Sequence, residues 1–295
     1  MPEIKKTGPK TGISRHKIEI FPEGFYAMVS RIEDLYVLQS IRPVKAIMPF
    51  GRKIARQLLN TELLKKELFS KAGLPFPARD IILSLDPFFP QKNDSELEEH
   101  ISALVRIGYT NFIVNNLGHF SMFRRKDEGE KAMLIAGPWL YAFNSHAWDF
   151  INKAGAEYCV SPLENNRQNL ERTFPAENHF IRKKVFVTVF SSPALFRICA
   201  DLHKAYNFEH FSGRKDENFR MIPAEEGTIV HPQEPFSLLD KTPFLRKTGF
   251  TRFILDFSSG PLKKPEYRRI MEAAQNADPI SGAGRFNWKN GFYTL

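Results

Sequence analysis

The chain has 295 residues, which suits one large domain or two modest ones with a substantial core. Hydrophobic residues make up 42% of it and charged residues 25%, an ordinary globular composition, and no apolar run approaches the roughly 20 residues that span a bilayer. The formal net charge of +9 is typical either of a protein that binds nucleic acid or another anion, or of a solvated basic surface.

Residues 1–17 are rich in basic side chains and lack the apolar core of a secretory signal. In this stretch a single acid, Glu3, accompanies Lys5, Lys6, Lys10, Arg15 and Lys17. We therefore predict a flexible basic tail over 1–17, a single domain over 18–295, no membrane span and a cytoplasmic location.

From residue 18 onward, short apolar runs alternate with stretches of helical periodicity. Strands are predicted over 18–21, 25–30, 44–49, 80–85, 112–115, 134–143, 157–161, 185–190, 228–231 and 252–256. Helices are predicted over 32–41, 52–72, 95–107, 147–154, 167–172, 193–204, 235–247 and 265–276. The polar residues 207–220 are typical of a long loop, and the aromatic, turn-rich residues 282–295 favour a closing hairpin or an irregular tail.

Alternating strands and helices predict βα units and a mostly parallel sheet, either doubly wound or closed into a barrel. Neither standard glycine-rich phosphate loop is present, which disfavours a dinucleotide-binding fold. About eight units within about 250 residues favour the barrel. The predicted fold class is α/β, a TIM-barrel-like (β/α)8 domain, with an incomplete or irregular ring as the alternative.

The chain contains only two cysteines, Cys159 and Cys199, and each lies in an otherwise apolar stretch. This excludes a disulfide framework and predicts two buried free thiols. Two thiolates also cannot supply the four cysteine ligands that an iron–sulfur cluster usually takes. We expect no cofactor.

Polar residues follow many of the predicted strands. In a parallel α/β fold they lie at the carboxyl edge of the sheet, where such folds place their sites. The set comprises Asn115, Asn116, Asn144, His146, Ser161, Glu164, Ser191, Ser192, His231, Asp256 and Ser258. A Glu or His at this edge can act as a general acid or base, whereas Asn and Ser also serve as ordinary turn and cap residues.

Other kinds of site have weaker signals. None of the eight histidines has the spacing of a known metal motif, so no metal is predicted. No G-x-S-x-G nucleophile elbow is present. Aromatic residues interleaved with Arg and Lys indicate an RNA-binding surface as one alternative, although most of the 27 phenylalanines must belong to the core.

Three stretches of the sequence resemble a known family, the collagenase-like peptidases of family thirty-two, whose catalytic type is unknown. They are GYTNFIVNNLGHFSMF (108–123), YAFNSHAWDFINKAGAEYCVSPLENN (141–166) and VFVTVFSSPALFRI (185–198). The resemblance extends from Val44 to the C-terminus and is strongest over 76–260. It implies a (β/α)8-type barrel, in agreement with the alternation of elements.

Members of this family include reputed collagen-degrading proteases, and others are needed for hydroxylation of RNA bases or of ubiquinone. The hydroxylation-linked members typically carry four cysteines thought to hold an iron–sulfur cluster. This chain departs from that pattern, because after Val185 it offers only Cys199. It also looks like the C-terminal portion of longer members, which implies that a cysteine-bearing partner subunit would supply the missing part.

The resemblance implies a peptidase that acts on polypeptide. One alternative is a component of RNA or ubiquinone hydroxylation that works with a cysteine-bearing partner. Another is a catalytically degenerate barrel used as a binding module. The candidate catalytic residues are Glu164 and His146, and the candidate substrate-binding residues are Asn116, Asn144, Ser161 and Arg197.

Overall fold

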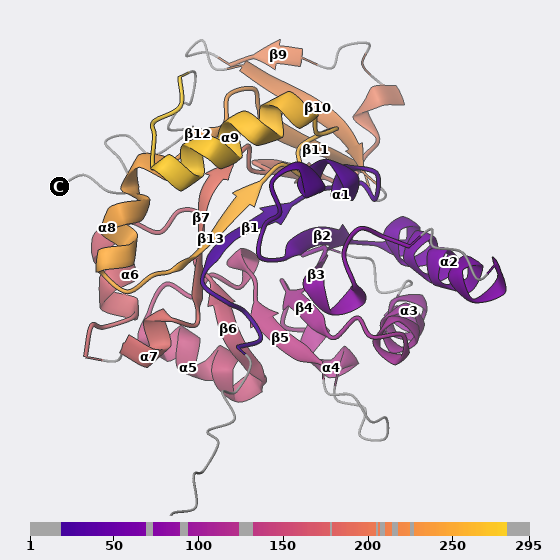
Figure 1. Ribbon diagram of the computed structural model, residues 1–295, viewed down its shortest axis with the longest axis horizontal. Helices are drawn as coiled ribbons and strands as arrows, with labels where there is room; N and C mark the ends of the chain where they lie inside the picture. Colours follow the sequence, from indigo (N-terminus) through magenta and orange to yellow (C-terminus); the bar gives the residue numbers. More distant parts are fainter. Residues whose placement is uncertain are drawn as a thin grey trace, which may run out of the picture.

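A ring of parallel strands forms the centre of the computed structural model (Figure 1). The structure describes residues 19–68, 73–88, 94–123, 132–177, 179–204, 206, 210–213, 218–224 and 227–281. The barrel strands are β1 (Gly24–Met28), β2 (Ala46–Phe50), β3 (Ile81–Leu85), β4 (Asn111–Val114), β5 (Met133–Ala136), β6 (Ala156–Val160), β7 (Val185–Ser191) and β13 (Arg252–Asp256). Parallel pairing of β6 with β7, β7 with β13 and β13 with β1 closes the ring, which confirms the predicted barrel.

Each barrel strand directs one large apolar side chain into the interior. These residues form a single buried cluster together with Phe21: Tyr26, Ile47, Ile82, Ile113, Ile135, Val160, Phe186 and Ile254. The strands are almost continuously apolar, because the outer face of the sheet is covered too. The interior is therefore a packed core rather than a pore.

Helices cover the outside of the ring (Figure 1). They are α1 (Asp34–Val37), α2 (Arg52–Leu68), α3 (Asp94–Arg106), α4 (His119–Met122), α5 (Ser145–Ala154), α6 (Arg167–Thr173), α7 (His179–Arg182), α8 (Thr242–Lys247) and α9 (Lys264–Asn276). In α3 the buried residues Leu97, Ile101 and Leu104 keep the spacing of one helical face. No helix in the described part of the chain is long and apolar enough to cross a membrane.

A second, antiparallel sheet lies between β7 and β13 in the chain. Its strands are β8 (Phe196–Ile198), β9 (His210–Ser212), β10 (Asn218–Ala224) and β11 (Gly227–Pro232), in the order β8-β11-β10-β9. On one face, Phe219, Met221 and Val230 form a small core of their own. A short strand, β12 (Phe236–Ser237), then pairs antiparallel with β7.

The second sheet overturns two sequence-based expectations and confirms a third. The helix predicted over 193–204 is wrong, because this segment contains β8 and a 3-10 turn (Leu202–Lys204), and the Leu195 amide donates to the Val230 carbonyl oxygen at 2.8 Å. The strand predicted over 228–231 exists, but it belongs to the second sheet. The loop predicted over 207–220 contains β9 and the start of β10.

Other boundaries also differ. The run 134–143 is strand only as far as Ala136, since Pro138 begins a 3-10 turn (Pro138–Leu140). The predicted strand 18–21 is absent over its described residues, and Phe21 instead packs edge-on against Tyr158 at 4.7 Å. The helix predicted over 32–41 is split between α1 and a 3-10 turn (Leu38–Ser40), and in 235–247 the α-helix begins only at Thr242. The predicted tail 1–17 and closing segment 282–295 lie outside the described residues.

The amino-terminal end of the barrel contains a fully buried guanidinium. Arg252, the first residue of β13, is 1% exposed. Its Nε donates to the Phe21 carbonyl oxygen at 2.7 Å, and its Nη atoms donate to the Lys183 carbonyl oxygen and to the Glu19 carboxylate. These bonds connect β13 to the segments that precede β1 and β7, so Arg252 joins three parts of the chain at the amino-terminal end of the barrel.

Replacing Arg252 with methionine is expected to lower the free energy of unfolding by roughly 2–4 kcal/mol, because a buried and a partly buried carbonyl oxygen and a carboxylate lose their donors. Urea unfolding measures the change. The matched control is Arg268→Gln on α9, where the side chain is 54% exposed and a change within about 0.5 kcal/mol is expected. Equal midpoints for the two variants would contradict this role for Arg252.

Candidate functional site

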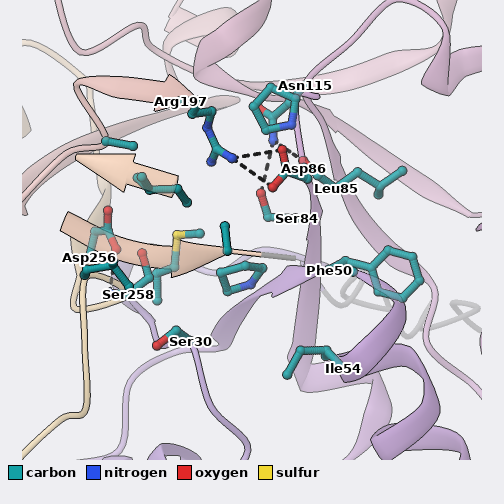
Figure 2. Close-up of a pocket in the computed structure, with 18 of the residues that line it drawn as sticks. Ser30, Phe50, Ile54, Ser84, Leu85, Asp86, Asn115, Arg197, Asp256 and Ser258 are labelled. Carbon is teal, nitrogen blue, oxygen red and sulfur yellow. Dashed lines mark hydrogen bonds and ion pairs between the residues drawn. The ribbon is translucent and has the colours of Figure 1, made fainter. Parts of the chain in front are cut away.

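A cavity of about 730 Å³ lies at the carboxyl ends of the barrel strands. Its apolar floor includes Ile47, Ile113, Val160 and Ile254 from the barrel interior. The polar and charged lining residues include Ser84, Asp86, Asn115, Thr188, Arg197, His231, Asp256 and Ser258. In Figure 2, Asp86, Ser84 and Asn115 lie on one side of this cavity, and Asp256 and Ser258 lie on the other.

The second sheet supplies one wall of the cavity. Ile222 of β10 and Ile229 of β11 are paired across the two strands, and His231 lies two residues further along β11. All three line the cavity. Because side chains alternate along a strand, the opposite face carries the small core formed by Phe219, Met221 and Val230. The sheet therefore has one face for its own core and one face for the barrel mouth.

Asp256 is held in place by two donors at the end of β13. Ser191 Oγ, at the end of β7, donates to Asp256 Oδ2 at 2.8 Å. The backbone N–H of Ser258 donates to Asp256 Oδ1 at 2.9 Å. These bonds fix the carboxylate against the wall of the cavity, where it contributes negative charge.

His231 is a buried imidazole with a defined tautomer. Its Nδ1 lies 2.8 Å from the Ser192 carbonyl oxygen, which can only accept, so Nδ1 carries the proton. Burial lowers the pKa of His231, and the nearby Arg220 and Arg197 act in the same direction, whereas the Ser192 hydrogen bond and Asp256 oppose them. His231 is therefore neutral at pH 7, and its Nε2 is an acceptor in the lining of the cavity.

Arg197 on β8 joins the second sheet to the barrel. Its Nη1 donates to both carboxylate oxygens of Asp86, at 2.9 and 2.8 Å, and Asp86 directly follows β3 (Figure 2). The guanidinium also lies 5.6 Å from the ring centroid of Trp139. The pair is partly exposed, so it adds little to stability but fixes the position of β8 over the mouth.

Asn115, which directly follows β4, is locked in position by its neighbours. Its Nδ2 donates to the Leu85 carbonyl oxygen at 2.7 Å and to Ser84 Oγ at 3.2 Å. A Cβ on Gly137 would lie only 1.8 Å from Asn115 Oδ1, so only glycine fits at position 137. The Asn115 backbone N–H donates to Nδ1 of His119, whose pKa burial lowers to about 4, which keeps that imidazole neutral.

Of the six candidate site residues predicted from the sequence, the structure places Arg197 in the cavity lining. Asn144 is the N-cap of α5, where its Oδ1 accepts the Ala147 N–H at 2.8 Å. Asn116 accepts the Gly118 N–H at 2.9 Å and donates to the Pro87 carbonyl oxygen. Both make the turn and cap bonds that their residue type favours.

The other three lie in or near the loops that follow β5 and β6. Ser161 is 2% exposed, and its Oγ accepts from Asn165 Nδ2 at 3.3 Å. His146 in the first turn of α5 and Glu164 in the loop after β6 are exposed, and Glu164 contributes to the raised pKa of Tyr141. None of the five lines the cavity, so the structure does not bring the predicted catalytic pair together with Arg197.

Sequence reasoning found some lining residues and missed others. Asn115, His231, Asp256 and Ser258 belong to the predicted carboxyl-edge set, and all four line the cavity. Asp86 was missed, although it follows the predicted strand 80–85 directly and meets the same criterion. No described group of three or more His, Cys, Asp or Glu residues could hold a metal ion.

The expectation of two buried thiols is correct for Cys159 and wrong for Cys199. Cys159 is fully buried in β6, and burial raises the pKa of its thiol to about 12. Cys199 is exposed and lines the cavity, because it directly follows β8 and does not lie in the helix that the apolar pattern predicted.

Comparisons with known proteins find no matching family model and no matching curated protein. Among solved structures, the U32 peptidase Mk0906 is aligned over 89% of this chain and 98% of its own, at 10% identity and a TM-score of 0.43. The Bacillus megaterium QM B1551 spore cortex-lytic enzyme SleL is aligned over 89% of this chain and 75% of its own, at 10% identity and a TM-score of 0.32. Similarities this distant assign no function.

In the native protein we expect one thiol, Cys199, to react with Ellman's reagent at pH 8 and both to react in denaturant, because only the thiolate of an accessible cysteine is nucleophilic. Absorbance at the wavelength of the released thiolate counts the reacting groups. The variant Cys199→Ser should abolish the native reaction, and Cys159→Ser should leave it unchanged. Two native thiols, or none, would contradict this assignment.

Proposed function

We propose that the protein binds one organic molecule, or one apolar segment of a larger molecule, in the cavity at the barrel mouth. The observation that carries the proposal is the cavity itself, which the second sheet walls in at the carboxyl ends of the strands. Its volume of about 730 Å³ lies within the range of small-molecule sites, about 300–1,000 Å³. The carboxyl face is also where barrel proteins place their sites.

The lining supports a ligand with an apolar body and a polar end. Side chains such as Ile47, Ile254 and Ile222 offer contact area that favours transfer of apolar groups out of water. A few fixed polar groups, including His231 Nε2 and the carboxylate of Asp256, offer hydrogen bonds that orient the ligand. This combination favours the interpretation as a binding barrel.

Hydrolysis of polypeptide is the second candidate function, and the position and hydrogen bonding of His231 favour it. A neutral imidazole whose Nδ1–H is fixed by a backbone carbonyl can take a proton from water at Nε2. Asp256 contributes to the environment of this imidazole and would stabilise its protonated form. The peptide substrate class rests on the sequence resemblance alone. Modification of RNA or ubiquinone depends on a cysteine-bearing partner and stays an expectation from the same resemblance.

Filling the cavity should weaken binding of an uncharged probe. N-phenyl-1-naphthylamine is apolar, small and fluorescent when bound, and Ala194 lies in the lining between β7 and β8. We expect Ala194→Trp to weaken probe binding by about tenfold or more, because the indole occupies the space that the probe needs. Fluorescence titration measures the affinity.

The matched control is Ala200→Trp, which places the same side chain at an exposed position that does not line the cavity. It should bind the probe as the parent protein does. Failure of the parent protein to bind the probe, or equal affinities for the two tryptophan variants, would count against the mouth as the binding site.

If the protein hydrolyses peptides, cleavage of gelatin or a quenched peptide library should fall at least about a hundredfold in His231→Gln, which removes the base. The acid limb of the pH profile should lie below the usual histidine pKa of about 6.5, because burial lowers the pKa of His231. A His146→Gln variant tests the residue predicted from the sequence. Absence of cleavage by the parent protein would leave binding as the function, and an unchanged rate in His231→Gln would remove His231 from the chemistry.

A further inference from the structure

A further guanidinium lies beside the residues that line the cavity, at Arg220 on β10. Arg220 pairs with His231 across the β10–β11 ladder, two positions from the Ile222–Ile229 pair. Cross-strand partners lie on the same face of a sheet, and His231, Ile222 and Ile229 all line the cavity. The Arg220 side chain therefore lies on the cavity face of the second sheet, at the edge of the site.

Its contacts leave much of the guanidinium unused. Arg220 Nη2 donates to Ser259 Oγ at 2.5 Å, in the loop that follows β13. Arg220 Nε is buried and has no hydrogen-bond partner among the described residues. A Cβ on Gly260 would lie 3.5 Å from Nη1, so this end of the guanidinium lies next to Gly260, which lines the cavity.

Arg220 also forms no ion pair within the described residues. Two guanidiniums that line the mouth have carboxylate partners, Arg197 with Asp86 at 2.8 Å and Arg31 with Asp34 at 2.6 Å. No described carboxylate forms an ion pair with Arg220, and burial lowers its pKa while only Glu266 opposes this. A partly buried cation without a counterion is costly, and a bound anion would offset that cost.

We propose that Arg220 forms an anion subsite, which binds a carboxylate or phosphate group of the ligand whose apolar body fills the cavity. This inference rests on the proposed function and names the ligand class for the same site. A planar guanidinium suits both anions, because it can donate two parallel hydrogen bonds to their oxygens. The ligand is thus an amphipathic organic anion rather than a neutral apolar molecule.

Two probes that differ by one anionic group test this assignment. The dye 8-anilino-1-naphthalenesulfonate is N-phenyl-1-naphthylamine with an added sulfonate. We expect the sulfonate to bind more tightly than the neutral dye, and Arg220→Gln to weaken only the sulfonate, by about tenfold. Arg220→Lys, which keeps the charge, should restore part of the loss. Arg268→Gln, which removes an equal charge from the exposed face of α9, should change neither affinity by more than about twofold.

Competition separates the two sources of the anion. 1-Naphthoate, 1-naphthyl phosphate and uncharged 1-naphthol are titrated against the bound sulfonate dye, and the tighter of the two anions identifies the natural group. If the neutral dye binds but Arg220→Gln weakens both dyes equally or neither, the anion subsite is wrong and the cavity stays a binding site. If neither dye binds the parent protein, both the subsite and the proposed function are overturned. Near-ultraviolet circular dichroism verifies that each variant is folded.

Discussion

Closure of the parallel strands into a ring is the constraint on which the rest of the structure depends. The final pairing of β6 with β7 uses two residue pairs, and β13 then joins β7 to β1. Parallel strands in a closed ring all end at the same rim. Closure therefore brings Asp86, Asn115 and Asp256 to one mouth, although they are far apart in the chain (Figure 2). Without closure the cavity would have no floor and no common edge.

Two arginines at opposite ends of the barrel differ in how many of their hydrogen-bond donors have partners. Arg252 at the amino-terminal end of the barrel is fully buried and donates to backbone carbonyl oxygens and to the Glu19 carboxylate. Arg220 beside the mouth is partly buried, donates to one serine and forms no ion pair with a described carboxylate. A buried cation whose donors are used stabilises the fold, whereas one whose donors are unused is available to a ligand. This difference carries the proposed ligand class.

The sequence predicted the barrel because the periodicities of strands and helices are local signals. Seven of the eight barrel strands lie within a few residues of their predicted positions. It failed over 193–204, where Ser192-Pro193 resembles a helix start but the segment gains an antiparallel partner in β11. Such pairing is nonlocal, and no periodicity within the segment encodes it. Residues that directly follow a strand can be identified from local sequence. Which of these residues line the same cavity depends on the second sheet, so the sequence could not predict it. Asn144 and His146 follow β5 and its 3-10 turn, yet they form the N-cap and the first turn of α5 and do not line the cavity.

The most direct test of the mouth as the ligand site uses Cys199, which is exposed and lines the cavity. The measurement is the rate at which iodoacetamide alkylates Cys199 with and without saturating 8-anilino-1-naphthalenesulfonate. A dye bound in the mouth covers the thiol, so the rate should fall in proportion to occupancy. An unchanged alkylation rate when the dye is fully bound would show that the dye binds elsewhere and would contradict the assignment of the ligand site to the barrel mouth.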